Sequence, residues 1–124
     1  MSEYAAVAGK FAEVQKGLTN RFAGEKETTG QIVESAGATT LLTPAASKFI
    51  TLYWIWLFSS QENSGEVTAT VKLGSKTAYV SYLGNPGAFA HWEPIAGSVG
   101  DKLILELSGP QKVAVSYTYS EMVP

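Results

Sequence analysis

The first part of the chain carries a helical pattern of apolar positions. Val7, Phe11, Val14 and Leu18 recur at spacings of four, three and four, with charged residues between them. This spacing predicts an amphipathic helix over residues 3–22. Two heptads of apolar seam are too few for a helix to be stable alone in water, so the helix must pack against another surface. That surface is either the chain's own sheet or a partner.

The pattern changes after this N-terminal arm, residues 1–24. The sequence Gly-Glu-Lys-Glu-Thr-Thr-Gly that begins at Gly24 is polar and charged, which is typical of a connection. We assign residues 25–30 to a linker. The rest of the chain lacks helical periodicity and is rich in Val, Thr, Tyr, Ile and Trp, with turn residues about every ten positions. Residues 31–124 are therefore expected to form an all-β domain.

Alternation and turn residues place about eight strands in this domain. The expected strands are 31–35, 39–43, 48–59, two in a hairpin over 66–83, 88–93, 102–107 and 112–119. In the last two strands the core-facing set is Leu103, Leu105, Leu107, Val113, Val115, Tyr117 and Tyr119. Antiparallel strands without long crossovers predict a jelly-roll-like β-sandwich preceded by the helix, with an immunoglobulin-like sandwich as the alternative.

The strand over residues 48–59 is apolar on both faces. Strict alternation puts one set on each face, namely Phe49, Tyr53, Ile55 and Leu57 against Ile50, Leu52, Trp54, Trp56 and Phe58. Such a strand must be covered on both sides. A sandwich of this size buries only one face of each strand in its own core. We expect the helix or another subunit to cover the second face, and we favour the subunit.

The hairpin has the clearest local signal. A two-residue turn at Gly74-Ser75, with glycine first as a type II′ turn prefers, pairs Leu73 with Lys76. The register then opposes Val71 to Ala78, Ala69 to Val80 and Val67 to Tyr82, so that the apolar residues of both strands lie on one face.

Composition narrows the classes of partner. With 45% hydrophobic residues, 124 residues fit one folded domain with a real core. A net charge of −2 without a basic cluster disfavours nucleic-acid binding. The longest apolar run, residues 49–58, is too short to cross a bilayer, and the N-terminus lacks the pattern of a secretory signal, so no membrane association is expected.

Few residues have the chemistry that catalysis needs. The chain has no Cys, one His and one Asp. The neighbours of His91 supply neither a carboxylate nor a nucleophile, and a single His without Cys does not begin a zinc site. Asp101 follows a glycine and is expected to accept backbone hydrogen bonds in a turn. We expect no enzymatic activity, no metal and no cofactor.

The aromatic residues allow a sugar site as an alternative. Tyr79, His91 and Trp92 lie near expected loops, where aromatic rings stack on sugars in many β-sandwich lectins. Trp54 and Trp56 also share a strand face, but apolar neighbours surround them, which favours a core or subunit contact.

The order of strands and turns resembles a group of small virion proteins. Thr39-Thr40-Leu41-Leu42-Thr43-Pro44, Phe49-Ile50-Thr51-Leu52, the hairpin from Val67 to Val80, Gly100-Asp101-Lys102-Leu103-Ile104-Leu105 and Val113-Ala114-Val115-Ser116-Tyr117 carry this likeness. Over about residues 29–122 the chain is similar to the capsid decoration (cement) proteins of tailed bacteriophages and related accessory proteins. The resemblance implies a non-enzymatic homotrimer on the capsid surface of a virion, bound to the major capsid protein. The alternative function is a sugar- or receptor-binding module of a phage tail tip or fibre. The expected capsid or oligomer contacts are Val7, Phe11, Val14, Leu18, Trp54 and Trp56.

Overall fold

The computed structural model describes residues 26–60, 62, 65–84 and 86–124. The predicted helix of residues 3–22, with its apolar seam, lies outside this part. Nine strands form in the described residues. Their bounds are β1 (Glu27–Val33), β2 (Gly37–Leu42), β3 (Phe49–Ser59), β4 (Val67–Leu73), β5 (Lys76–Leu83), β6 (Gly87–His91), β7 (Ile95–Ala96), β8 (Leu103–Leu107) and β9 (Val113–Met122).

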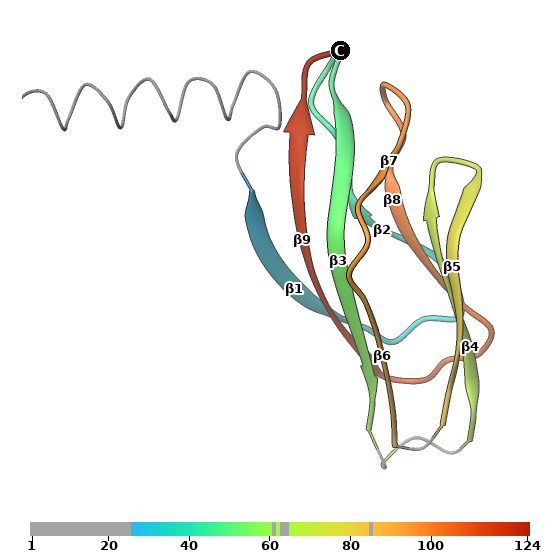
Figure 1. The fold of residues 1–124 in the computed structure, drawn as a ribbon. Coiled ribbons are helices and arrows are strands. Elements are labelled where there is room, and N and C mark those ends of the chain that lie inside the picture. The colour runs from blue at the N-terminus through green and yellow to red at the C-terminus, as the bar shows by residue number, and fades with distance from the viewer. Residues whose placement is uncertain (1–25, 61, 63–64, 85) are drawn as a thin grey trace, which may run out of the picture.

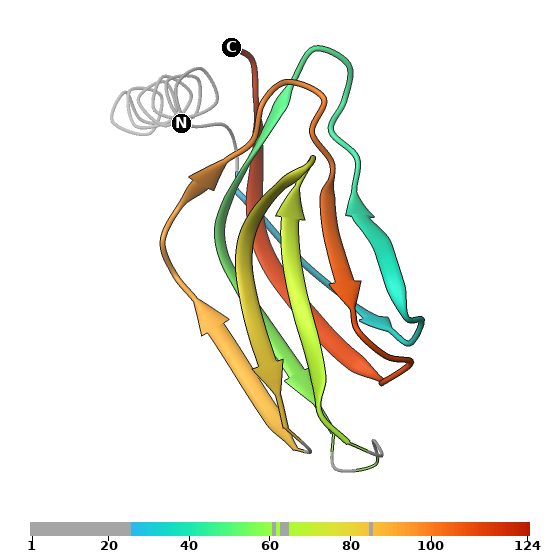
Figure 2. The same cartoon turned by 90° about the vertical axis from the view of Figure 1, so that its right-hand side faces the viewer.

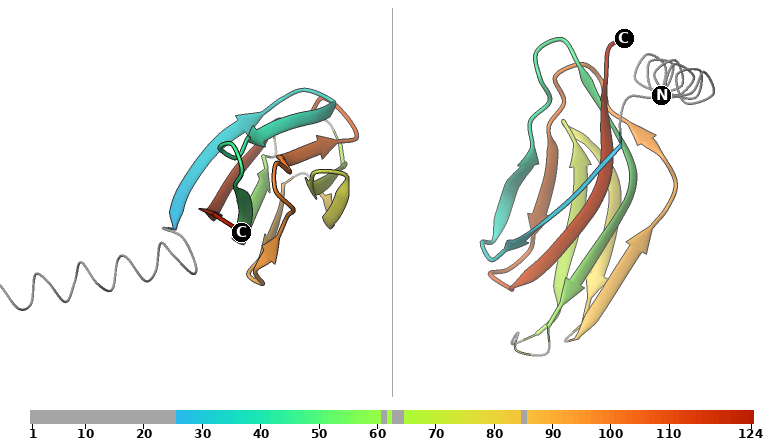
Figure 3. Two further views of the ribbon diagram at one scale, coloured as in Figure 1. Left: turned by 90° about the horizontal axis from the view of Figure 1, so that it is seen from above. Right: turned by 90° about the vertical axis from the view of Figure 1, so that its left-hand side faces the viewer.

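The strands form two antiparallel sheets that face each other (Figure 1). One sheet has the order β1-β9-β3-β6, with the two-residue strand β7 also paired to β3, and the other has the order β2-β8-β4-β5. Figure 2 looks onto the second sheet, and Figure 3 shows the two layers from above and the outer side of the first. Successive long strands change sheet or form hairpins in the manner of a double Greek key. This confirms the predicted jelly-roll-like β-sandwich.

The space between the sheets is filled by alternating aliphatic side chains. On β8 the pattern is as predicted: Leu103 and Leu105 are fully buried and Leu107 is nearly so. Val113 and Val115 of β9 are buried in the same core, and Tyr117 reaches across it to donate its hydroxyl proton to the Leu41 carbonyl at 3.1 Å. A continuous apolar core of this kind is the main source of stability for the sandwich.

Strand β1 begins earlier than its polar sequence indicates. Pairing with β9 starts at Glu27 opposite Tyr119 and continues to Val33 opposite Val113. Residues 27–30, which the composition assigns to the linker, therefore belong to the first sheet. Their side chains are exposed, and the strand is held by its backbone hydrogen bonds to β9. At the other end, the strand stops at Val33, before the expected limit of residue 35.

The hairpin register is right at the turn and wrong beyond it. Leu73 pairs with Lys76, as predicted, but the register shifts next to Lys72, so that Val71 lies opposite Tyr79. Ala78 is the extra residue of a β-bulge. Beyond the bulge the faces of β5 are the reverse of the prediction, with Ser81 buried and Val80 half exposed. Tyr82, also predicted to face the core, is 79% exposed.

A second bulge lies in β3. Leu52 pairs with Tyr119 and Trp54 with Thr118, which leaves Tyr53 as the extra residue. The bulge resets the alternation, so that Ile50 and Leu52 share the core with Ile55 and Leu57. Strict alternation placed these pairs on opposite faces, and that assignment is wrong. Trp54, Trp56 and Phe58 point away from the core, as one group.

Candidate functional site

The strongest candidate surface is the outer side of the β1-β9-β3-β6 sheet, which we call the aromatic face. The bulge at Tyr53 directs Trp54, Trp56 and Phe58 of β3 to this side. Trp56 and Phe58 are 39% and 36% exposed, and their rings stack with centroids 5.7 Å apart and planes within 7° of parallel. These side chains form an aromatic ridge along β3, which lies between β9 and β6 in the sheet. Figure 3 (right) shows the course of these strands on this side of the molecule.

Small residues flank the ridge on both sides. Trp56 pairs with Ala90 of β6 and with Ser116 of β9, and Phe58 pairs with Ala88 and Ala114 on the same two strands. Paired residues in a sheet point to the same side. The ridge therefore stands above strips of short side chains, and it is accessible along its flanks.

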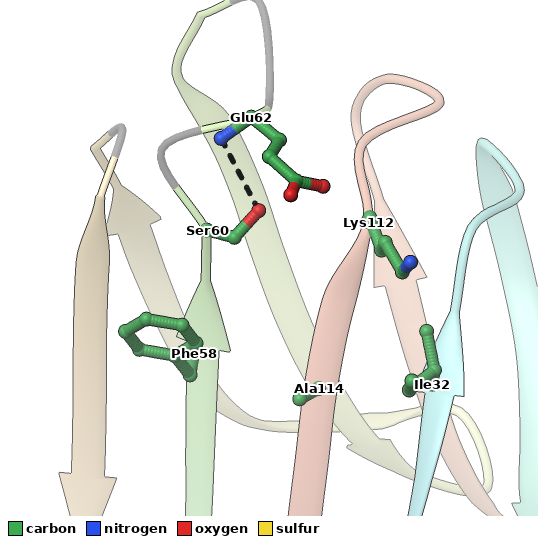
Figure 4. Close-up of a pocket in the computed structure, with 6 residues that line it drawn as sticks. All are labelled: Ile32, Phe58, Ser60, Glu62, Lys112 and Ala114. Atoms are coloured by element: carbon green, nitrogen blue, oxygen red, sulfur yellow. Dashed lines mark hydrogen bonds between the residues drawn. The ribbon is translucent and has the colours of Figure 1, made fainter.

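A shallow pocket lies between the ridge and β1 (Figure 4). It has a volume of about 220 Å³. Its apolar wall consists of Phe58, Ala114 and Ile32, which is 59% exposed, and polar groups lie at its mouth, where the Glu62 amide donates to Ser60 Oγ at 3.3 Å. Lys112 also lies at the mouth, with its ammonium 3.9 Å from Glu34 Oε1. An apolar floor with a charged rim suits a protein contact better than a substrate site.

The opposite end of the aromatic face is polar. Thr28 Oγ1 and Thr118 Oγ1 share a hydrogen bond of 2.7 Å between β1 and β9. The Tyr53 hydroxyl and Ser120 Oγ are 2.9 Å apart, and the Lys26 ammonium lies 4.3 Å from the centre of the Tyr53 ring. These contacts hold the entry to β1 against the outer side of the sheet.

Trp92 adds a third tryptophan to this surface. It is 70% exposed, and its ring centroid lies 5.5 Å from that of Trp54. The two residues are far apart in the sequence and meet because β6 pairs with β3. All three tryptophans of the chain thus gather on the aromatic face.

The three residues expected to form a sugar site do not converge. His91 pairs with Ile55 and so lies on the core side of the sheet, where its ring centroid is 3.9 Å from that of Tyr79 and the two planes are tilted by 31°. The Tyr79 hydroxyl donates to the Glu93 carbonyl at 3.0 Å, and the Glu93 amide donates to His91 Nδ1 at 3.3 Å. Burial, and secondarily the charge of Glu93, raises the pKa of Tyr79 above its usual value. Trp92 lies on the other side of β6, so Tyr79 and His91 form an edge cluster of their own.

The described residues bring together little chemistry. Asp101 accepts a hydrogen bond from the Ser98 amide at 2.9 Å, as predicted for a turn. Within residues 26–60, 62, 65–84 and 86–124, no group of three or more His, Asp or Glu side chains is placed to hold a metal ion. In the same ranges, no helix has the length and apolar character to span a bilayer.

Sequence reasoning found part of this surface. It placed Trp54, Trp56 and Phe58 on one strand face, and the structure brings these three together. It missed Ile32 and the joining of Trp92 to the ridge. In Gly87–His91, alanine alternates with larger residues. This pattern indicates a strand that lies beside another strand with large side chains, but it does not identify that neighbouring strand.

Comparisons with known proteins bear on the fold. No family model matches the chain, and no curated protein matches its sequence. Solved structures with a similar fold include the following two. A chain in the structure of Bacillus endospore appendages, described as disulfide-linked pili, has a TM-score of 0.52 at 10% identity and covers 81% of this chain and 88% of that one. A chain in the acid-stable capsid structure of Helicobacter pylori bacteriophage KHP30 has a TM-score of 0.52 at 11% identity, covering 77% and 93%. At these identities the similarity establishes a shared β-sandwich fold.

Proposed function

We propose that this protein is a non-enzymatic structural subunit that assembles with copies of itself and with other virion proteins. In its most specific form, the proposal is a capsid decoration protein that binds the major capsid protein on the head surface as a homotrimer. The aromatic face carries the proposal. A contiguous patch of exposed tryptophan, phenylalanine and isoleucine is more apolar than a monomeric soluble protein usually presents to water.

The composition of the aromatic face supports a protein partner. Tryptophan is enriched at the energetic centres of protein interfaces, where it is surrounded by contacts that exclude water. Trp56 lies at the centre of the ridge, and polar groups such as Lys112 and Thr28 lie at the ends. An apolar centre with a polar rim is the usual arrangement of a contact that forms and buries surface.

The fold supports the same class of function. The sandwich is similar to a chain in a bacteriophage capsid and to a chain in bacterial pili, both of which are assemblies. These likenesses carry no residue-level information because identity is 10–11%. They add to the observation on the aromatic face and do not replace it.

The test is the mass of the full chain in solution by light scattering, over a range of protein concentrations. We expect a homotrimer that dissociates on dilution, and we expect Trp56→Ser with Phe58→Ser to shift the equilibrium to the monomer. The control is Tyr82→Ser, because Tyr82 is exposed on the other sheet. A wild-type protein that stays monomeric at every concentration contradicts the oligomeric proposal. Cosedimentation with capsids then tests the decoration role.

A further inference from the structure

The aromatic face lacks a cover in the described part of the chain. Trp56, Phe58 and Ile32 remain substantially exposed, and the strips beside the ridge are made of small residues. A free subunit with this surface open would lack the stabilisation that comes from removing apolar surface from water. Some segment is therefore expected to lie on this face before assembly.

The entry to β1 shows where the preceding segment leaves the sheet. Lys26 is the first described residue, and its side chain lies over the Tyr53 ring on the outer side of the sheet. Thr28 follows, bonded to Thr118 on the same side. Thr118 is the partner of Trp54 in the register of β3 and β9. The chain therefore enters β1 at the Trp54 end of the aromatic ridge, and residues 1–25 are joined to the sheet at this end.

The connection is short but sufficient. Because β1 starts at Glu27, only residues 23–26 separate it from the predicted helix of residues 3–22. That length reaches at most ~17 Å from the end of the helix to Glu27. Crossing from β1 over β9 to β3 takes about 10 Å. Packing a helix above the sheet takes about 10 Å in the perpendicular direction. The helix can thus lie on its own ridge, with its C-terminal end beside Tyr53.

The dimensions of the two apolar surfaces match. From Val7 to Leu18 the seam of a helix extends ~16 Å, at about 1.5 Å per residue. From Trp54 to Phe58 the ridge extends ~13 Å, at about 3.3 Å per residue. The seam occupies one stripe of the predicted helix, and the ridge occupies one strand of the sheet. The seam is therefore long enough to cover the whole ridge.

We infer that residues 3–22 of the same chain pack as an amphipathic helix on the aromatic face of the unassembled subunit. The seam of Val7, Phe11, Val14 and Leu18 covers the ridge of Trp54, Trp56 and Phe58. A segment tethered by four residues has an effective concentration in the millimolar range or higher, which favours its own sheet over that of a second copy at ordinary dilution. The inference goes beyond the proposed function and does not rest on it. In an assembling subunit, this helix would have to be displaced before the face could bind a partner.

Cysteine cross-linking in the full chain tests this inference directly, because the wild-type sequence contains no Cys. Val14→Cys is combined with Ala90→Cys or with Ser116→Cys, the two positions beside Trp56. The control combines Val14→Cys with Tyr82→Cys on the opposite sheet. After mild oxidation with diamide at low protein concentration, we expect an intramolecular disulfide in at least one test pair, seen as monomer mass without free thiol, and none in the control.

Tryptophan fluorescence gives a second readout. All three tryptophans lie on the aromatic face, so their emission reports on the cover of this surface. Phe11→Asp places a charge in the seam and is expected to shift the emission to longer wavelength. Lys10→Asp introduces the same carboxylate on the polar side of the helix and is expected to leave the emission unchanged.

Two results would overturn the inference. Disulfide-linked dimers from the test pairs, in place of intramolecular bonds, would show that a second copy supplies the helix. Equal cross-linking in test and control pairs, with no emission shift in Phe11→Asp, would show that the face is not covered by this segment. Light scattering decides separately whether the protein forms a trimer.

Discussion

Gly74 and Asp101 pack so closely that no side chain fits between them. A Cβ atom on Gly74 would lie 2.5 Å from Asp101 Oδ1, and the backbone of Gly74 has a φ of 62°. The Gly74 amide donates to the Lys102 carbonyl at 2.9 Å, while Asp101 itself accepts from the Ser98 amide. The turn between β4 and β5 is thus joined to the loop that leads into β8.

This arrangement makes Gly74 sensitive to substitution. Gly74→Val is expected to lower the free energy of unfolding by at least ~2 kcal/mol, because a branched side chain is strained at positive φ and collides with the Asp101 carboxylate. Ser75→Asn, at the exposed second turn position, is expected to change it by less than about 0.5 kcal/mol. Urea unfolding measures both. Equal effects at the two positions would place the turn elsewhere.

The bulge at Ala78 predicts which residues of the hairpin tolerate charge. Val71→Asp and Ser81→Asp bury a carboxylate in the sandwich and are expected to cost several kcal/mol, as is Val115→Asp in β9. Val80→Asp is expected to cost less than about 1 kcal/mol, because Val80 is 50% exposed. Thermal melts of these variants distinguish the register with a bulge at Ala78 from the strictly alternating register. Unfolding by Val80→Asp with tolerance of Ser81→Asp would restore the strictly alternating hairpin.

Tyr119 gives the fold a pH dependence at the alkaline end. Burial, a hydrogen bond to Glu27 and the charges of Glu27 and Glu121 raise the pKa of Tyr119 to about 12. The folded state therefore holds this proton more tightly than the unfolded chain, in which the pKa is about 10. The contribution to stability is complete below about pH 10 and is lost as the pH rises through 12.

Absorbance of the phenolate measures this effect. In a spectroscopic titration, Tyr119→Phe is expected to remove the component with a pKa of about 12. Glu27→Gln is expected to lower the pKa of Tyr119, because it removes the charge that opposes the phenolate. A titration unchanged by either variant would contradict the contact between β1 and β9 at this end of the sheet.

The sugar-binding alternative makes a separate prediction. Trp92 is the most exposed aromatic ring on the aromatic face, but Tyr79 and His91 lie on the other side of β6. Because the three residues do not converge on one site, they are expected to bind no glycan. On a glycan array we expect no signal above background for the wild type. Binding that disappears in Trp92→Ala, and persists in Tyr82→Ala, would instead support a receptor-binding module.

Most of the fold follows from sequence because core-facing and outward-facing residues alternate regularly along most strands. Leu103, Leu105 and Leu107 alternate with polar or less buried residues, and Gly74 marks the turn that sets the hairpin. The errors come from features that local pattern does not contain. A bulge is one additional residue in a strand, and whether Tyr53 or Ala78 is that residue depends on the partner strand. The sequence does not show that β1 begins in a polar segment, for a related reason. Backbone pairing with β9, and not burial of side chains, stabilises this part of the strand.

The candidate surface was predictable to a smaller extent. That Trp54 and Trp56 share a face follows from their spacing of two. That Trp92 joins them follows only from the pairing of β3 with β6, which depends on the topology of the sandwich. The sequence leaves open the order of strands in a sheet, and contacts between distant strands require that order.

The bulge at Tyr53 has a consequence for how this surface could have arisen. Because Tyr53 is the residue that β9 leaves unopposed, the strand on either side of it keeps the pairing that it would have if Tyr53 were absent. Deleting Tyr53 alone, by the loss of one codon, would place Trp54 directly after Leu52 in regular alternation, with Trp54, Trp56 and Phe58 still on the outer side and Ile55 and Leu57 still in the core. By the same reasoning, an ancestral strand with strict alternation could have gained Tyr53 by a single insertion without moving the aromatic row from its face.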